Sequence, residues 1–253
     1  MPLPGEAAKL PPMLLAVVAD IHANLEALDA VLADIDAAAP TAVVSLGDNI
    51  GYGPDPALVL ARLAARGIPS VRGNHEWAVA DPARERLFNP QSREALWRTR
   101  ELLPQELIAR VAAYPTSLSL YGCRFVHGLP PNDTATYLFE AGDVTLRRAF
   151  ARTAERISFV GHTHMLEATA LRGREVLRYE LGVGDNPLDA RERHIVNVGS
   201  VGQPRDGDTR AKYGLYDDAR GVLTIRAVPY DAKATAAKII ARGLPRRYAD
   251  RLL

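Results

Sequence analysis

The chain has 253 residues, of which 47% are apolar and 24% are charged, and its formal net charge is +1. This is the composition of an ordinary globular protein, long enough to bury a substantial core in one large or two small domains. The near-neutral charge argues against a protein that coats nucleic acid, because such proteins usually carry a pronounced basic excess.

The N-terminal part and the single cysteine exclude further classes. Residues 1–12 form a Pro-rich leader, and the apolar run Met13–Ala19 that follows is too short to span a bilayer. Cys123, the only cysteine, leaves no internal disulfide and no thiolate metal cluster. We therefore predict a cytoplasmic protein that does not interact with a membrane.

The first third of the chain predicts a βαβα order. Met13–Ala19 predicts a buried strand, and Asn24 can cap a helix that ends before a second strand at Thr41–Leu46. The apolar face of that first helix is formed by Leu25, Leu28, Leu32 and Ile35. A second helix is predicted at about 55–66, with a short strand at Val71.

The middle segment, Trp77–Ala113, predicts helices only, with Ser92 as a plausible cap. It forms either a cap over a site or a simple helical layer. Most of the chain beyond it predicts strands, at Ser117–Tyr121, Arg124–Val126, Ile157–Val160, Val176–Leu181, Ile195–Val198, Tyr213–Tyr216 and Val222–Pro229. One helix is expected after Asp143, which is its candidate cap.

The C-terminal end is basic and predicts a solvated helix face, with arginines at Arg242, Arg246, Arg247 and Arg251. No internal repeat or low-complexity linker divides the chain. We therefore predict a single domain at residues 13–253 with two sheets, in which 77–113 is a helical cap-like segment.

Five predicted strands are followed by polar clusters that contain or adjoin glycine. They read "VVADIHAN", "VVSLGDNIGYG", "SVRGNHEW", "RFVHG" and "SFVGHTH". Ligand sites of α/β sheets collect at the carboxyl ends of strands. Five of the six histidines lie in these clusters, and His194, outside them, is expected to be an ordinary structural histidine.

The clusters together predict a metal site, although a lone polar residue after a strand is usually a turn former. A given four-residue string is expected about once in 10^5 positions, so several in a fixed order are not chance. Their oxygen and nitrogen donors suit two divalent ions such as Mn, Fe, Zn, Ni or Co. The candidate ligands are Asp20, His22, Asp48, Asn74, His127, His162 and His164.

In this order, "DIH", "GD", "GNHE", "VHG" and "GHTH" resemble the motifs of the calcineurin-like metallophosphoesterase superfamily. The turn "NVGSVGQPRDGD" is similar to its small prokaryotic branch of phosphodiesterases and phosphatases, and the resemblance covers about residues 13–230. It implies an α/β (α+β) fold, a four-layer α/β/β/α sandwich of two mixed sheets. The metal site would lie at the carboxyl ends of the strands.

The resemblance also implies roles for individual residues. The first metal would be held by Asp20, His22, Asp48 and His164, and the second by Asn74, His127, His162 and the bridging Asp48. His75 would be the catalytic residue that protonates the leaving oxygen or stabilises the transition state, and Glu76 would orient it. Many relatives have an acidic residue where this chain has Gly51, which argues against an analogy with the eukaryotic protein phosphatases.

The implied activity is hydrolysis of small phosphate esters, monoesters or diesters, by a hydroxide that bridges two divalent ions, with Mn favoured. Three alternatives stay open: a non-catalytic metal-binding scaffold, a phosphoprotein phosphatase and a dinucleoside-polyphosphate phosphatase. The oligomeric state is open as well. Other hydrolase templates fail, since "GSVG" lacks the first glycine of a nucleophile elbow and no HxHxDH run occurs.

Substrate contacts are predicted from two residues and two segments. Arg205 is either a phosphate-binding residue or a solvated loop arginine, and Tyr52 either lines the pocket or packs in its turn. The walls of the pocket are expected from Trp77–Ala113 and Leu129–Ala141.

Overall fold

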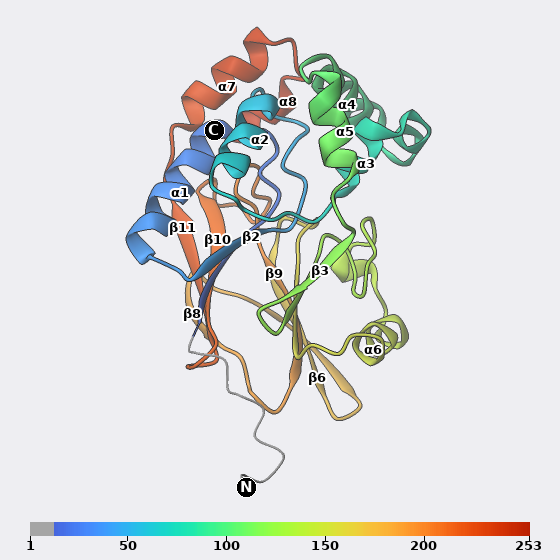
Figure 1. Ribbon diagram of the computed structural model, residues 1–253, viewed down its shortest axis with the longest axis vertical. Helices are drawn as coiled ribbons and strands as arrows, with labels where there is room; N and C mark the ends of the chain where they lie inside the picture. Colours follow the sequence, from blue (N-terminus) through green and yellow to red (C-terminus); the bar gives the residue numbers. More distant parts are fainter. Residues whose placement is uncertain (1–12) are drawn as a thin grey trace, which may run out of the picture.

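The protein, described here by a computed structural model, is built around two mixed β-sheets (Figure 1). The structure describes residues 13–253, so the leader predicted at 1–12 lies outside the described residues. The first sheet has the order β2 (Ala42–Ser45), β1 (Leu14–Val18), β10 (Ala211–Asp217), β11 (Val222–Val228) and β8 (Gly184–Pro187). Only β1 and β2 are parallel in it.

The second sheet has a parallel centre with antiparallel strands on both sides. Its order is β3 (Ser117–Leu120), β4 (Cys123–Val126), β5 (Ile157–Val160), β9 (Arg193–Val198), β6 (Leu166–Arg172) and β7 (Glu175–Glu180). Strand β5 runs parallel to both β4 and β9. The parallel pairs β1–β2 and β4–β5 therefore each bring two carboxyl ends to one edge of a sheet.

The helices fall into three groups. Helices α1 (Leu25–Ala38), α2 (Pro56–Ala65), α7 (Ala232–Ala241) and α8 (Arg247–Asp250) come from the two ends of the chain. The middle segment contains α3 (Asn74–Ala80), the 3₁₀ turn η1 (Pro82–Leu87), α4 (Pro90–Glu101) and α5 (Gln105–Ala112). The 3₁₀ turn η2 (Leu138–Glu140) and α6 (Asp143–Ala151) complete the set.

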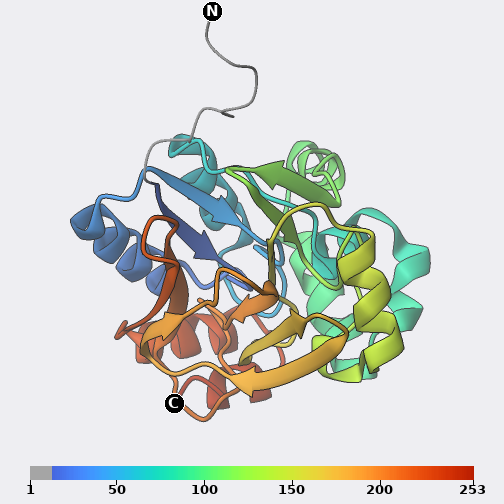
Figure 2. The same ribbon diagram turned by 90° about the horizontal axis from the view of Figure 1, so that it is seen from below.

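Alternating side chains on the strands create a four-layer arrangement. In β1, Leu15 and Val17 point into a core between the sheets, whereas Ala16 and Val18 pack against α1. In the second sheet, Phe159 faces the same inner core and the neighbouring Val160 packs against α6. Figure 2 shows the two sheets between the blue helix α1 and the yellow-green helix α6. The predicted α/β/β/α sandwich is confirmed.

Several local predictions were wrong. Helix α4 is capped by Asn89, whose side chain accepts from the Ser92 amide, rather than by Ser92. Gly142 holds the N-cap position of α6, and Asp143 is already its first helical residue. The strand expected at Val71 is reduced to an isolated bridge between Ser45 and Ser70. The Asn24 cap of α1 is confirmed, since its Oδ1 accepts from the Ala27 amide at 3.1 Å.

Strands β6 and β8 and helix α7 were not predicted, whereas α8 lies in the C-terminal end that was predicted to be helical. The basic C-terminal end is helical, but Tyr248 and Leu252 within it are buried against the rest of the molecule, so the segment is not simply a solvated face. Within residues 13–253, none of the helices has both the length and the apolar run needed to cross a membrane.

Candidate metal centre

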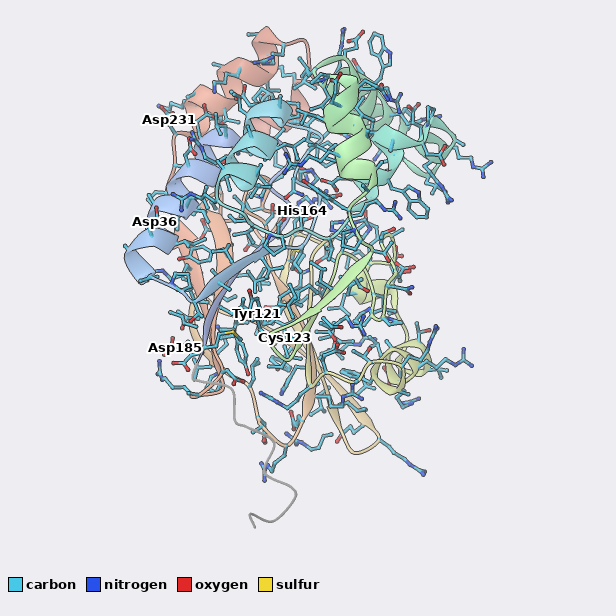
Figure 3. The ribbon with its side chains drawn as sticks, viewed as in Figure 1. Asp36, Tyr121, Cys123, His164, Asp185 and Asp231 are labelled. Atoms are coloured by element: carbon cyan, nitrogen blue, oxygen red, sulfur yellow. The ribbon has the colours of Figure 1, made fainter. Side chains whose placement is uncertain are left out.

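The candidate ligands converge where four parallel strand ends meet. Asp20 and His22 follow β1, Asp48 follows β2, His127 follows β4, and His162 with His164 follow β5. Asn74 and His75 begin α3. Figure 3 places His164 in the middle of the molecule, below α2 in this view. Apart from Asn74, which is partly exposed, these side chains are buried.

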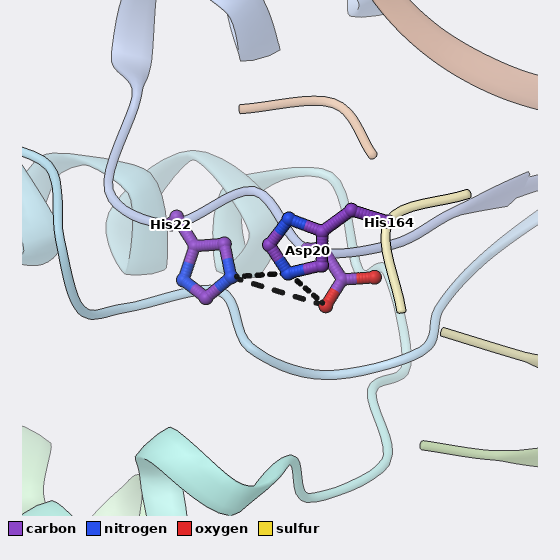
Figure 4. A group of neighbouring side chains, drawn as sticks. All are labelled: Asp20, His22 and His164. Atoms are coloured by element: carbon purple, nitrogen blue, oxygen red, sulfur yellow. Dashed lines mark hydrogen bonds and ion pairs between the residues drawn. The ribbon is translucent and has the colours of Figure 1, made fainter. Parts of the chain in front are cut away.

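Asp20, His22 and His164 form the first group of donors (Figure 4). The Nε2 atoms of His22 and His164 are 3.1 Å apart, and His164 Nε2 lies 3.3 Å from Asp20 Oδ1. His22 Nε2 is 3.9 Å from the same oxygen. Three donor atoms therefore surround one small space.

The backbone fixes which nitrogen of each of these rings carries the hydrogen. His22 Nδ1 lies 3.1 Å from the Ile50 carbonyl oxygen, and His164 Nδ1 lies 2.6 Å from that of Gln203. A carbonyl only accepts, so both Nδ1 atoms donate and both neutral rings turn an Nε2 lone pair inward. Two lone pairs 3.1 Å apart repel unless a cation or a proton lies between them. This donor set fits a divalent metal ion.

Asp48, His127 and His162 form the second group, with Asn74 beside it. His127 Nε2 lies 3.2 Å from Asp48 Oδ2 and 2.9 Å from Asn74 Oδ1, while its Nδ1 donates to the Leu46 carbonyl at 2.8 Å. His162 uses Nε2 to donate to the Ala135 carbonyl at 2.9 Å, which leaves Nδ1 as its acceptor atom. His162 and His164 thus belong to different groups.

Asp48 lies between the two groups. Its Oδ2 is 3.2 Å from His127 Nε2 and 3.8 Å from His22 Nε2, which belong to the second and the first group. Its other oxygen, Oδ1, accepts from the His75 amide at 2.9 Å. Asp48 is therefore close to donor atoms of both groups.

His75 forms a third possible metal-binding group with His22 and Asp48, but its ring has little polar support. Its Nε2 is 4.0 Å from Asp48 Oδ2, and among the described residues its buried Nδ1 has no hydrogen-bond partner. A Cβ atom at Gly51 would approach His75 Nδ1 to 2.1 Å, and the φ of +89° at Gly51 also favours glycine. Gly51, the position at which this chain departs from many relatives, therefore makes room for the ring.

Burial and the negative charge of Asp48 shift the pKa values of the histidines in opposite directions. Burial lowers the pKa of His162 to about 3 and the pKa of His75 to about 4. Burial also disfavours the charged form of His127, but the Asp48 carboxylate outweighs it and raises the pKa of His127 to about 9. A proton and a cation thus compete for the space beside Asp48.

The end of β9 and the turn after it hold the segments that carry the candidate ligands. Asn197 Nδ2 donates to the Gly161 carbonyl at 2.7 Å and to Thr163 Oγ1 at 2.8 Å, so it braces the segment that carries both histidines. Ser200 Oγ donates to the Asp20 carbonyl at 2.7 Å. These residues belong to the "NVGSVGQPRDGD" turn, whose supporting role was not predicted from the sequence.

Glu76 contacts the backbone rather than the His75 ring. Its carboxylate accepts from the amides of Asp48, Asn49 and Gly73 at 2.9, 2.7 and 2.9 Å. Glu76 is completely buried, and no hydrogen bond to the His75 ring occurs within residues 13–253. It joins the loop after β2 to the start of α3, and so fixes Asp48 relative to Asn74.

Replacing Glu76 with Ala is expected to lower the free energy of unfolding by about 3 kcal/mol or more, because it leaves three buried amides unpaired. The change is measured by urea unfolding of the metal-free protein. Glu101→Ala is the control, since Glu101 forms a half-exposed ion pair with Arg98 on α4 and its loss is expected to cost about 0.5 kcal/mol or less. A loss below about 1 kcal/mol for Glu76→Ala would contradict this role.

A cavity of about 160 Å³ opens directly above the donors. Tyr52, Trp77, Arg84, Phe88, Tyr137 and Arg205 line it, together with Asp48, Asn74, His75, His162 and His164. Both segments predicted as walls contribute to it. Arg205 faces the cavity, and among the described residues its Nε has no hydrogen-bond partner.

Of the aromatic side chains in the wall, Tyr52 was predicted and Tyr137 was not. Tyr137 stacks on the His162 ring, with centroids 4.1 Å apart and planes 9° apart. Tyr52 both lines the cavity and packs against His22 and His75, at centroid distances of 4.5 and 4.4 Å. Tyr52 therefore has both of the roles that were considered for it, lining the pocket and packing against neighbouring side chains. No periodicity marks these rings in the sequence, because each lies in a turn.

The backbone at the site is unusual. Five of the seven candidate ligands have a positive φ, namely Asp20 (53°), His22 (47°), Asp48 (49°), His162 (71°) and His164 (61°). Side chains other than glycine adopt this left-handed conformation at a cost of about 1 kcal/mol or more each. Strain of this kind is concentrated at functional sites.

Comparisons with known proteins agree with this geometry. Residues 13–220 match the family described as calcineurin-like phosphoesterase superfamily domain. An uncharacterized protein of Methanocaldococcus jannaschii is 30% identical over 252 residues, which cover 94% of this chain and 97% of that protein. A metallophosphoesterase of Sphaerobacter thermophilus superposes with a TM-score of 0.80 at 32% identity, covering 95% of this chain and 98% of the other. A hypothetical protein of Pyrococcus horikoshii OT3 shares the fold, with a TM-score of 0.74, 20% identity and coverage of 94% and 97%.

Proposed function

The chain belongs to the calcineurin-like phosphoesterase superfamily, and from this premise we propose that it hydrolyses small phosphate esters at a centre of two divalent cations. The placement of Asp48 between two groups of nitrogen and oxygen donors carries the proposal. Its Oδ2 lies 3.2 Å from His127 Nε2 and 3.8 Å from His22 Nε2, so this one carboxylate is within reach of both proposed cations.

The residues that would hold the cations follow from the two groups. Asp20, His22 and His164 would hold one, Asn74, His127 and His162 the other, and Asp48 both. Such cations supply positive charge to the phosphoryl oxygens and lower the pKa of a water molecule that attacks the phosphorus. Manganese is favoured, although the donors also suit Fe, Zn, Ni or Co.

Other residues would bind the substrate and assist the leaving group. The Arg205 guanidinium faces the cavity, its Nε has no hydrogen-bond partner within residues 13–253, and it would bind a phosphoryl oxygen. His75 would donate a hydrogen to the leaving oxygen as its charge develops. A cavity of about 160 Å³ supports a small substrate, because a cavity of roughly 150 Å³ holds one benzene molecule.

The proposal is tested by hydrolysis of p-nitrophenyl phosphate and bis-p-nitrophenyl phosphate in the presence of Mn²⁺. We expect release of p-nitrophenol from at least one of the two esters, and loss of that activity after chelation. The ester that reacts distinguishes a monoesterase from a diesterase. Protein that contains two metal ions per chain and hydrolyses neither ester would instead support a binding scaffold. We further propose that the protein acts in the cytoplasm, in keeping with its single buried cysteine.

A further inference from the structure

The C-terminal segment packs against the wall of the site. Helices α7 and α8 follow the last strand, and they lie beyond residues 13–220, which match the family. Figure 1 shows them, in red, at the same end of the molecule as α2 and α4. Tyr248 of α8 is only 3% exposed and belongs to an apolar cluster that includes Tyr52 and Ala95.

Tyr248 contacts the site through Tyr52. The two tyrosine rings are stacked, with centroids 4.5 Å apart and planes 29° apart. Ser92 Oγ of α4 lies 3.4 Å from both hydroxyl oxygens. Tyr52 in turn touches the rings of His22 and His75. A chain of packed rings thus runs from the C-terminal helix to two residues of the site.

This packing matters most for His75, because within residues 13–253 its ring Nδ1 has no hydrogen bond to orient it. The Nδ1 atom of His22 donates to a carbonyl, whereas the Nδ1 of His75 has no partner among the described residues. The His75 ring is held by its neighbours: Tyr52 meets it edge to face at 4.4 Å, and Phe88 does so at 5.1 Å. A shift of Tyr52 would leave one side of this ring unsupported.

We propose that Tyr248 is a positioning residue, which holds Tyr52 against His75 and His22 and thereby fixes both imidazoles. The effect on His75 rests on the proposed function. The effect on His22 concerns only metal binding. Displacement of a catalytic group by about 1 Å can lower a rate about 100-fold, and loss of a residue that supports a metal ligand lowers metal affinity about 10- to 100-fold.

The test compares Tyr248→Ala, Tyr248→Phe and the control Leu244→Ala. Leu244 is 4% exposed and lies in the same apolar cluster, so its truncation also removes buried contacts there. For Tyr248→Ala we expect kcat to fall about 10- to 100-fold with KM within about twofold, and Mn²⁺ affinity, measured calorimetrically, to fall about 10-fold. Tyr248→Phe keeps the ring and is expected to restore both values. Leu244→Ala is expected to lower the unfolding temperature but neither kcat nor Mn²⁺ affinity.

Three outcomes would overturn the proposal. In the first, Tyr248→Ala matches Leu244→Ala in both kcat and Mn²⁺ affinity. In the second, Tyr248→Phe is as impaired as Tyr248→Ala, which would assign the effect to the hydroxyl instead of the stacked ring. In the third, the wild-type protein binds no Mn²⁺. If the wild-type protein binds Mn²⁺ but hydrolyses neither p-nitrophenyl ester, the proposed function fails, and the relative Mn²⁺ affinities still decide the role of Tyr248.

Discussion

Replacing Asp48 with Asn is expected to remove at least one of two bound metal ions and to lower kcat about 1,000-fold or more. The amide has the shape of the carboxylate, and its oxygen can still accept from the His75 amide. It has no negative charge, however, and only one oxygen to offer. If Asp48 binds both metal ions, the loss of one carboxylate oxygen should weaken the binding of both ions.

The measurement is elemental analysis of the purified variant after incubation with Mn²⁺, together with turnover of the p-nitrophenyl ester that the wild-type protein prefers. Asp189→Asn is the matched control, since Asp189 pairs with Arg191 on an exposed loop. This control is expected to keep two ions per chain and wild-type turnover. Two ions per chain in Asp48→Asn would rule out a bridging role for this carboxylate.

Replacing His75 with Ala is expected to lower kcat about 100- to 10,000-fold while the metal content stays at two ions per chain. His75 lies outside the two groups proposed to hold the cations, and its Nε2 is 4.0 Å from Asp48 Oδ2. Its loss should therefore affect the leaving oxygen and not the binding of metal. KM is expected to change little, because the hydrogen bond strengthens only as charge develops in the transition state.

His194→Gln serves as the control for this variant. His194 is buried between other groups, with Nε2 3.0 Å from the Asp189 carbonyl and Nδ1 3.3 Å from the Tyr179 hydroxyl. It is the satisfied structural histidine that the sequence predicted, and its replacement is expected to leave turnover unchanged. If His75→Ala turned over substrate at the wild-type rate, His75 would have no part in the chemistry. If it lost metal as Asp48→Asn is expected to do, His75 would be a ligand.

Most of the fold could be predicted because most strands are recognisable as apolar runs in the local sequence. The apolar run of β1 alternates between two buried layers, and β5 is buried at every position. Strand β8 gave no such signal, since its sequence "GDNP" consists of turn-forming residues and it is a strand only through pairing with β11 at the sheet edge. Helix α7, by contrast, was predictable from its sequence, because Asp231 caps it and many of its residues are alanine, a strong helix former.

The candidate ligands could be identified because each belongs to a recognisable motif, and all but Asn74 follow a strand. The residues around them could not. Tyr248 lies far along the chain from Tyr52, and nothing in either local sequence indicates that their rings stack. Glu76 was expected to orient His75, but the structure gives it three backbone amides instead. Local patterns predict which donors exist, whereas the contacts that fix their positions depend on tertiary packing.

Five candidate ligands have a left-handed backbone that lowers the stability of the fold. They are Asp20, His22, Asp48, His162 and His164. Glycine would adopt the same conformation without steric cost, so at each of these positions it would relieve strain while deleting a donor. A library of variants screened for heat resistance alone would therefore be enriched in sequences that lack the centre. Aspartate and histidine at all five positions carry this conformational cost, and such cost is typical of functional sites.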